Sequence, residues 1–246
     1  SRAEAEKIAT DYLGQFGYTP QNYKFANSFS GGGSSLYYLQ RTLGVEESNR
    51  RMANEEWPLY YWSARWFKPM EKEEFVIYLM PDGEFLGFRR VIKEDAPGAD
   101  IPQEDAGVIA ESFLSQYAGW DAAKWEQVEA ASETRSGGRV DPSFAWKSRA
   151  FSAGESELRY NLTIQGDQVG YVDYWIKVPE DFMRQYALER DQAGFLNLIA
   201  YFLGFLGLLG AGLFGITMIR PDNQRALWPS LLVAGVSLAA ALNFIS

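Results

Sequence analysis

Two short stretches decide which fold this sequence predicts: MPDGEFLGFRR (Met80–Arg90) and, further along the chain, IQGDQVGYVDY (Ile164–Tyr174). Gly83 and Gly166 occupy the same place in the two stretches, and in both a second glycine followed by an aromatic residue comes four positions later. Two-residue β-hairpins select an aspartate beside a glycine, because both residues tolerate positive φ. Neither stretch has the spacing of a P-loop or of a dinucleotide-binding loop. We therefore predict two structural hairpins in corresponding places.

The sequence around the two hairpins repeats as well. SRAEAEKIATDYLGQF (1–16) aligns with PQEDAGVIAESFLSQY (102–117), and WSARWF (62–67) aligns with WKSRAF (146–151). In the first pair the apolar residues recur at i, i+3, i+4 and i+7, which predicts an amphipathic helix. Alternating segments rich in Tyr, Trp, Val and Ile follow each helix and predict strands. We therefore expect an α+β fold of two tandem repeats, each a helix packed on an antiparallel sheet.

The repeats have predicted boundaries at 1–100 and 101–180, and each is expected to contain one helix and three strands. The first repeat carries an insertion at 28–58, in which the glycines at 31–33 indicate a flexible link. Within the insertion, LYYLQRTLG (36–44) is interpreted as an extra strand. A duplicated scaffold with one enlarged loop often places its specific function in that loop.

Aromatic residues are dense in and around the insertion. Five of them are the candidate binding residues: Tyr37, Tyr38, Trp57, Trp62 and Trp66. One interpretation assigns them to the core and the sheet surface. The other makes them a groove for apolar or extended peptide segments, or a contact with lipid headgroups. Such residues mark an interface only when they are exposed together.

Composition excludes several classes of function. The 246 residues contain no histidine and no cysteine, so Ser-His-Asp and Cys-His sites cannot form and the common zinc ligands are missing. Residues 1–192 hold 21 Lys and Arg against 31 Asp and Glu, an acidic balance that argues against nucleic-acid binding. The paired glutamates lack the spacing of a calcium-binding loop. We expect no catalytic residue, no metal site and no cofactor in this chain.

The carboxy-terminal part predicts a membrane anchor. Residues 193–219 are uncharged and long enough to span a hydrocarbon core of about 30 Å, and residues 226–246 form a second uncharged run. A polar loop of six residues separates the runs, which predicts a two-helix transmembrane hairpin. Residues 181–192 are expected to connect it to the second repeat. The chain begins without a methionine and ends in an apolar run, so we expect a longer membrane protein.

Positive and small residues give the hairpin an orientation and a packing face. Arg220 and Arg225 lie in the short loop, which favours a cytoplasmic loop and places the acidic residues 1–192 outside the cytoplasm. Gly207, Ala211 and Gly215 recur at every fourth position of the first run, where small residues let another helix approach closely.

These features resemble the amino-terminal extracytoplasmic region of bacterial CPBP intramembrane metalloproteases, the CAAX-protease or Abi family. The resemblance covers about residues 1–200. It rests on SRAEAEKIATDYL (1–13), WSARWF (62–67), PDGEFLGF (81–88), their second copies, and the span that follows PEDF (179–182). PepSY-like and cystatin-like modules share this layout of repeats, so the resemblance implies the fold more strongly than the family.

The resemblance implies that the catalytic metal site lies elsewhere in the parent protein. The family's membrane helices use Glu-Glu-x-x-x-Arg and later histidines. EESNRR (46–51) matches the first pattern, but it lies in a polar soluble segment and no histidine completes a site. No catalytic residue is therefore carried over, and the active site is expected beyond Ser246.

The leading functional expectation is an extracytoplasmic, substrate-recruiting domain with the first membrane helices of an intramembrane endopeptidase. Its expected partners are membrane lipid, membrane-protein or peptide substrates, and the remaining membrane helices of the same protein. The alternative is a non-enzymatic, membrane-anchored binding or assembly subunit. A third and weaker one is a protease inhibitor, by analogy with PepSY-like modules.

Overall fold

The computed structural model describes residues 1–54 and 57–218. The first half contains α1 (Arg2–Gln15), β1 (Lys24–Gly31), α2 (Gly33–Leu43), α3 (Val45–Asn54), β2 (Tyr60–Phe67), β3 (Glu74–Leu79) and β4 (Phe85–Val91). The second contains α4 (Gln103–Tyr117), the short 3₁₀ helix η1 (Ala122–Lys124), β5 (Trp125–Thr134), β6 (Val140–Ser148), β7 (Glu157–Gln165) and β8 (Gln168–Lys177). The long helix α5 (Glu180–Met218) follows. The predicted α+β class is confirmed.

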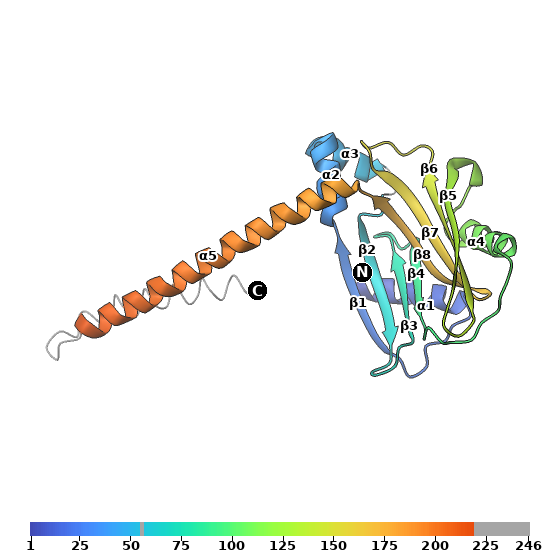
Figure 1. Cartoon of the computed structure of the whole chain (residues 1–246), viewed down its shortest axis with the longest axis horizontal. Helices are drawn as coiled ribbons and strands as arrows, with labels where there is room; N and C mark the ends of the chain where they lie inside the picture. Colours follow the sequence, from blue (N-terminus) through green and yellow to red (C-terminus); the bar gives the residue numbers. More distant parts are fainter. Residues whose placement is uncertain (55–56, 219–246) are drawn as a thin grey trace. The chain divides into compact units, whose positions relative to one another are not determined.

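All eight strands form one antiparallel sheet in the order β1-β2-β3-β4-β8-β7-β6-β5 (Figure 1). Each half contributes four strands to the sheet, one strand more than the sequence predicted for each repeat. The additional strands, β1 and β5, are the two edges of the sheet. The two predicted hairpin turns are present, since Gly83 and Gly166 both have positive φ, at 103° and 70°.

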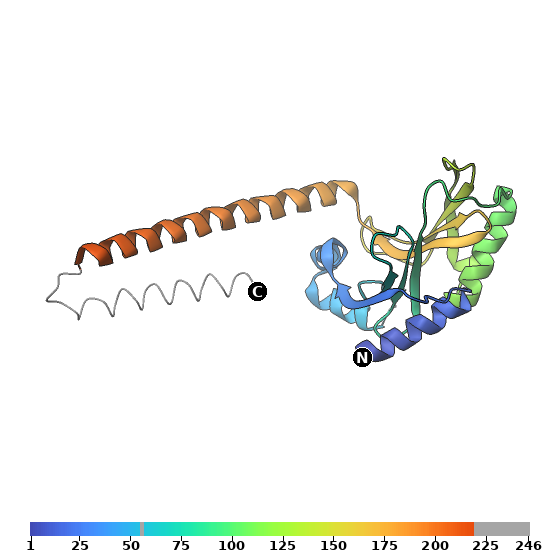
Figure 2. The same ribbon diagram turned by 90° about the horizontal axis from the view of Figure 1, so that it is seen from below.

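One hydrophobic core unites the two halves. It contains buried residues of α1 and α4 together with one face of the strands from both halves. Both helices line this face of the sheet (Figures 1 and 2). They also meet each other through Phe16, which caps the end of α1 and whose ring lies 5.0 Å from Phe113 and 4.8 Å from Tyr117 of α4. The side chains of Ser1 and Glu4 cap the start of α1 in a capping box.

The two halves join along a short ladder, which we call the seam. Only two residue pairs connect β4 to β8, Phe88 with Val172 and Arg89 with Tyr171, whereas the other neighbouring strands pair through at least five. Gly87 lies next to this ladder, where a Cβ atom would be 2.6 Å from the carbonyl oxygen of Val172. The seam therefore depends on a close backbone approach that a side chain at position 87 would prevent.

The structure corrects two predictions about local conformation. LYYLQRTLG (36–44) was expected to be a strand, but it forms most of α2, because Tyr38 and Leu39 bury a helical face in a second hydrophobic cluster. Residues 181–192 were expected to be a connection, but they are helical and belong to α5. The insertion at 28–58 starts inside β1 and contains α2 and α3.

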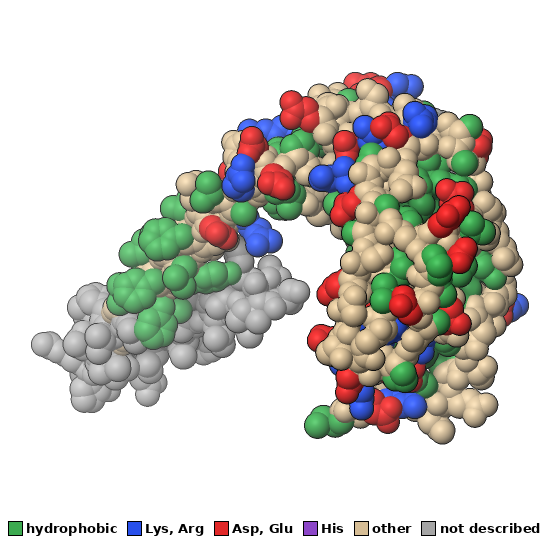
Figure 3. Space-filling view, turned by 45° about the vertical axis from the view of Figure 1, so that its right-hand side comes forward, with side chains coloured by type: hydrophobic (Ala, Val, Ile, Leu, Met, Phe, Trp, Pro, Cys, Tyr) green, Lys and Arg blue, Asp and Glu red, His purple; other side chains and the backbone are tan. Residues whose placement is uncertain are grey.

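The chain divides into two units, one up to Met183 and one that starts at Arg184. Within α5, the stretch Glu180–Leu208 is long and apolar enough to cross a membrane, by length and composition alone, and none of its most apolar window is buried. Figure 3 shows charged side chains scattered over the α+β unit and mainly hydrophobic ones on the described part of α5. The predicted second span at 226–246 and the loop with Arg220 and Arg225 lie outside the described residues.

Candidate functional site

The five aromatic residues predicted to form a binding surface are not exposed together. Trp66 is 5% exposed in the main core and Trp62 packs against the same core. Tyr38 and Trp57 are 7% and 5% exposed in the second cluster. Tyr37 alone is substantially exposed, at 38%. The five residues are apart because the aromatic residues of the helical insertion pack into a second hydrophobic cluster at the ends of β7 and β8.

The second cluster fastens the insertion to the start of α5. The backbone N–H of Glu155 donates a hydrogen bond of 2.9 Å to the hydroxyl of Tyr38. The ring of Tyr38 lies 4.9 Å from that of Phe182, edge to face, and Tyr37 lies 5.9 Å from the same ring. These aromatic residues therefore stabilise the exit of the chain from the sheet and do not form a groove.

The predicted helix-packing face lies on α5. Gly207 is exposed, with open space around the position of a Cβ atom. Ala211 and Gly215 belong to the same helix, but the surroundings of their side chains lie outside the description.

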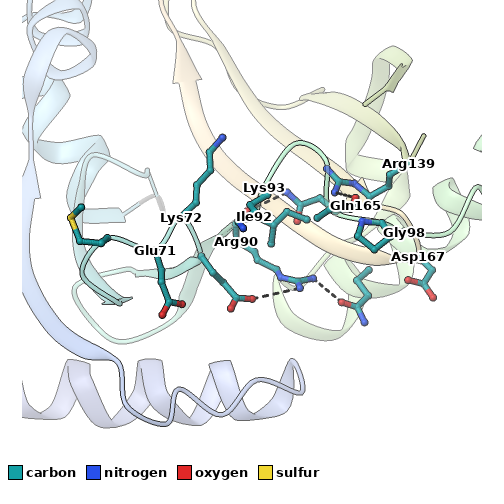
Figure 4. A pocket seen from close by; sticks show the side chains of 14 residues that line it. Glu71, Lys72, Arg90, Ile92, Lys93, Gly98, Arg139, Gln165 and Asp167 are labelled. Carbon is teal, nitrogen blue, oxygen red and sulfur yellow. Dashed lines mark hydrogen bonds and ion pairs between the residues drawn. The ribbon is translucent and has the colours of Figure 1, made fainter. Parts of the chain in front are cut away.

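A large cleft lies at one end of the seam, where β4 and the β7–β8 turn diverge. It has a volume of about 690 Å³, and Figure 4 shows Lys72, Arg90, Lys93 and Arg139 around it. The arginine side chains that line this cleft make hydrogen bonds that stabilise the fold. Arg90 donates to the side-chain oxygen of Gln168 at 2.9 Å, and buried Arg139 donates to the carbonyl oxygen of Ala96 at 2.8 Å. These bonds hold the two halves and their linker together.

A smaller pocket of about 290 Å³ lies at the other end of the seam, and we call it the seam pocket. Most of its side chains come from β2, β3, β4 and β8, and they include Tyr61, Tyr78, Arg89, Tyr171, Asp173 and Trp175. Successive side chains of a strand point to opposite faces. Ile77, Phe88 and Val172 lie in the core beneath α1 and α4, so their neighbours Tyr78, Arg89, Tyr171 and Asp173 occupy the opposite face.

The acidic centre of the seam pocket is Asp173. Burial raises the pKa of its carboxyl group above the ordinary value of 3.8, and a hydrogen bond of 3.1 Å from the hydroxyl of Tyr171 opposes this only in part. Burial and the nearby charge of Asp173 also raise the pKa of Tyr171. The pKa of Tyr78 rises mainly through burial, with a smaller contribution from Asp173. The tyrosines are therefore neutral hydrogen-bonding groups around a partly desolvated carboxylate.

Arg89 also lines the seam pocket, but its guanidinium group pairs with Glu74 and not with Asp173. Its guanidinium pairs with Glu74 at 3.2 Å, and Arg65 pairs with the same carboxylate. The Nε atom of Arg89 is buried without a hydrogen-bond acceptor among the described residues. Among those residues Asp173 has no Lys or Arg within 4.0 Å, which leaves its carboxylate without a cationic partner.

This pocket was not among the sites predicted from the sequence. The alternation around Val172 could have shown that Tyr171 and Asp173 lie on the face opposite the core. It could not have shown that β4 and β8 are neighbours, which brings Tyr78 and Arg89 close to them. Among residues 1–54 and 57–218, no three acidic side chains lie close enough together to hold a metal ion.

Comparisons with known proteins do not assign the chain to a family. No protein-family model and no curated protein matches the sequence. A solved structure of the Bacillus megaterium YpeB C-terminal domain is similar, with 12% sequence identity and a TM-score of 0.40. The match covers 70% of this chain and 62% of the other. Neither value is high enough to assign a function.

Proposed function

We propose that this chain is a membrane-attached binding module that recruits a partner protein through the seam pocket. The observation that supports the proposal is the pocket itself: aromatic and polar side chains from both halves meet there around a carboxylate that has no cationic partner in the described part of the chain. Pockets with apolar walls and a few convergent polar groups are the usual form of binding sites. The apolar helix α5 supplies the attachment.

The parent protein, in this proposal, is an intramembrane endopeptidase of the CPBP type. The support is the resemblance of the paired helix-and-strand segments, together with a sequence that has no histidine or cysteine of its own for catalysis. The two halves would descend from a duplication, consistent with their equivalent element order. The chain would then present substrates outside the cytoplasm, while its membrane hairpin packs on the catalytic helices.

Photo-crosslinking in membranes that contain the complete protein tests recruitment. A benzophenone amino acid replaces Tyr61 in the pocket, and a matched variant carries it at Val128, which is 38% exposed on the edge strand β5. We expect position 61 to form adducts with membrane-protein segments that position 128 does not form. Tyr78→Ala should remove these adducts. Identical adducts at both positions, insensitive to Tyr78→Ala, would refute the proposal.

A second measurement separates the two candidate functions. If the module serves a protease, Tyr78→Ala in the complete protein should slow cleavage of the crosslinked partners. If the chain is instead an assembly subunit, the partners should accumulate in a stable complex and their cleavage should not depend on the pocket.

A further inference from the structure

From the geometry of the seam pocket we infer that Asp173 binds a primary ammonium group, supplied by a lysine side chain in an extended segment of the partner. The inference deepens the proposed function and rests on it for the identity of the partner. It adds the chemical class of the ligand, which the proposed function leaves open.

The carboxylate of Asp173 requires a cation more than a surface carboxylate does. It lies in a half-buried position, and its one hydrogen bond within residues 1–54 and 57–218 comes from a neutral group, the hydroxyl of Tyr171 at 3.1 Å. Buried charges in proteins are normally paired with an opposite charge. Two other carboxylates on this face have arginine partners: Glu74 pairs with Arg65 and Arg89, and Glu157 of β7 pairs with Arg159. Asp173 is the one acid among the described residues that line the seam pocket, and no Lys or Arg of the described chain neutralises it.

The walls of the pocket suit the alkyl stem and the head of a lysine. Tyr61 and Tyr78 pack edge to face with their ring centroids 5.7 Å apart, and Trp175 also lines the pocket. Lysine buries its methylene groups along apolar surface, and its ammonium group is attracted to aromatic faces. A volume of about 290 Å³ is at the lower limit for small-molecule sites, so it suits one side chain better than a whole ligand.

Hydrogen-bonding groups favour a primary ammonium over a quaternary one. A lysine head carries three N–H donors, and the pocket offers acceptors in the carboxylate of Asp173 and the tyrosine hydroxyls. The hydroxyls of Tyr61 and Tyr78 make no hydrogen bond with other described residues. A quaternary ammonium would leave these acceptors unpaired, so it should bind less tightly.

Arg89 is the main opposing feature, because its positive charge faces the same pocket. Its effect is limited, since Glu74 neutralises part of that charge at 3.2 Å and the unpartnered Nε atom is buried rather than open to the pocket. An anionic ligand at Arg89 would be the competing outcome, so the experiment includes an anionic probe.

The test uses ligand-observed NMR on the complete protein in lipid nanodiscs. The probes are N-acetyl-lysine methylamide, N-acetyl-norleucine methylamide (which keeps the four side-chain carbons of lysine and lacks the ammonium group), tetramethylammonium and acetate. We expect binding of the lysine probe to exceed that of the norleucine and tetramethylammonium probes by about tenfold, and acetate not to compete. Equal binding of the lysine and norleucine probes, or displacement by acetate, would overturn the inference without any variant being made.

Variants then assign binding to the carboxylate. Asp173→Asn should weaken the lysine probe by about tenfold, and Asp173→Glu should restore most of the binding. The matched control is Asp167→Asn, the same change at an exposed aspartate of the β7–β8 turn. If Asp173→Asn binds the lysine probe as tightly as the wild type, the inference fails.

Failure of the inference can be told apart from failure of the proposed function. Crosslinks from position 61 that depend on Tyr78 but not on partner lysines would retain recruitment and overturn the lysine site. Binding of the lysine probe without any such crosslinks would support the ammonium site and refute recruitment of a membrane protein. Methylation of partner lysines to the quaternary state is the final check, because it should weaken the crosslinks if the inference holds and leave them unchanged if it does not.

Discussion

Gly87 gives the sharpest prediction about how the two halves are joined. In Gly87→Ala, the new Cβ atom would lie 2.6 Å from the carbonyl oxygen of Val172, whereas ordinary contacts begin at 3.4 Å. The backbones must therefore separate by about 0.8 Å at a seam that consists of two residue pairs. Unlike a flexible side chain, the carbonyl of Val172 cannot rotate away. We expect a loss of about 1–3 kcal/mol, the usual cost of overpacking a tight site.

Urea unfolding of the complete protein in detergent, followed by tryptophan fluorescence, measures this loss, because seven of the eight tryptophans lie in residues 1–183. The matched control is Gly107→Ala on α4, where the nearest ring atoms of Phe144 would be 3.7 Å from the new Cβ atom. It should gain about 0.5–1 kcal/mol, because alanine is the better helix former. If Gly87→Ala is as stable as the wild type, the argument that a close backbone approach holds the seam is wrong.

Three further predictions concern buried polar groups. Burial alone would raise the pKa of Asp141, but hydrogen bonds from Arg139 at 2.7 Å and from Arg135 hold it below 3.8. The stability that the ionised carboxylate of Asp141 contributes is therefore present above pH 3.8 and is lost as the pH falls through the folded pKa. Asp141→Asn should cost about 3–5 kcal/mol at pH 7 and much less in acid, measured by urea unfolding across pH. The pKa of Asp173 is raised in the folded state, so its carboxyl group contributes most to the free energy of unfolding below pH 3.8. This contribution falls as the pH rises through the folded pKa. Asp173→Asn should therefore be more stable than the wild type at pH 7, and a loss of stability there would contradict the desolvation argument. Tyr38→Phe removes the acceptor of the 2.9 Å bond from the backbone of residue 155 and should cost about 0.5–1.5 kcal/mol in the same assay; no change would exclude a stabilising role for this bond.

The hairpins and main helices were predictable because their signals are local. Asp82 beside Gly83 selects a turn with positive φ, and the apolar spacing of residues 1–16 selects a helix wherever the chain folds. The segment 36–44 was misassigned because a short apolar run with two tyrosines fits a strand or a helix equally well. Burial of Tyr38 and Leu39 against β7 and β8 decided for the helix, and that contact joins segments far apart in the sequence.

The sequence by itself determined the class of the fold, the apolar helix and the absence of histidine and cysteine chemistry, because composition and periodicity carry each of these. Only the tertiary structure decided which side chains could meet. The aromatic residues of the insertion were drawn into a second core, while the pairing of β4 with β8 placed Tyr78 and Arg89 beside Asp173. The physical reason is that a strand's own pattern sets which face each side chain occupies, whereas its neighbours depend on pairing across the whole chain.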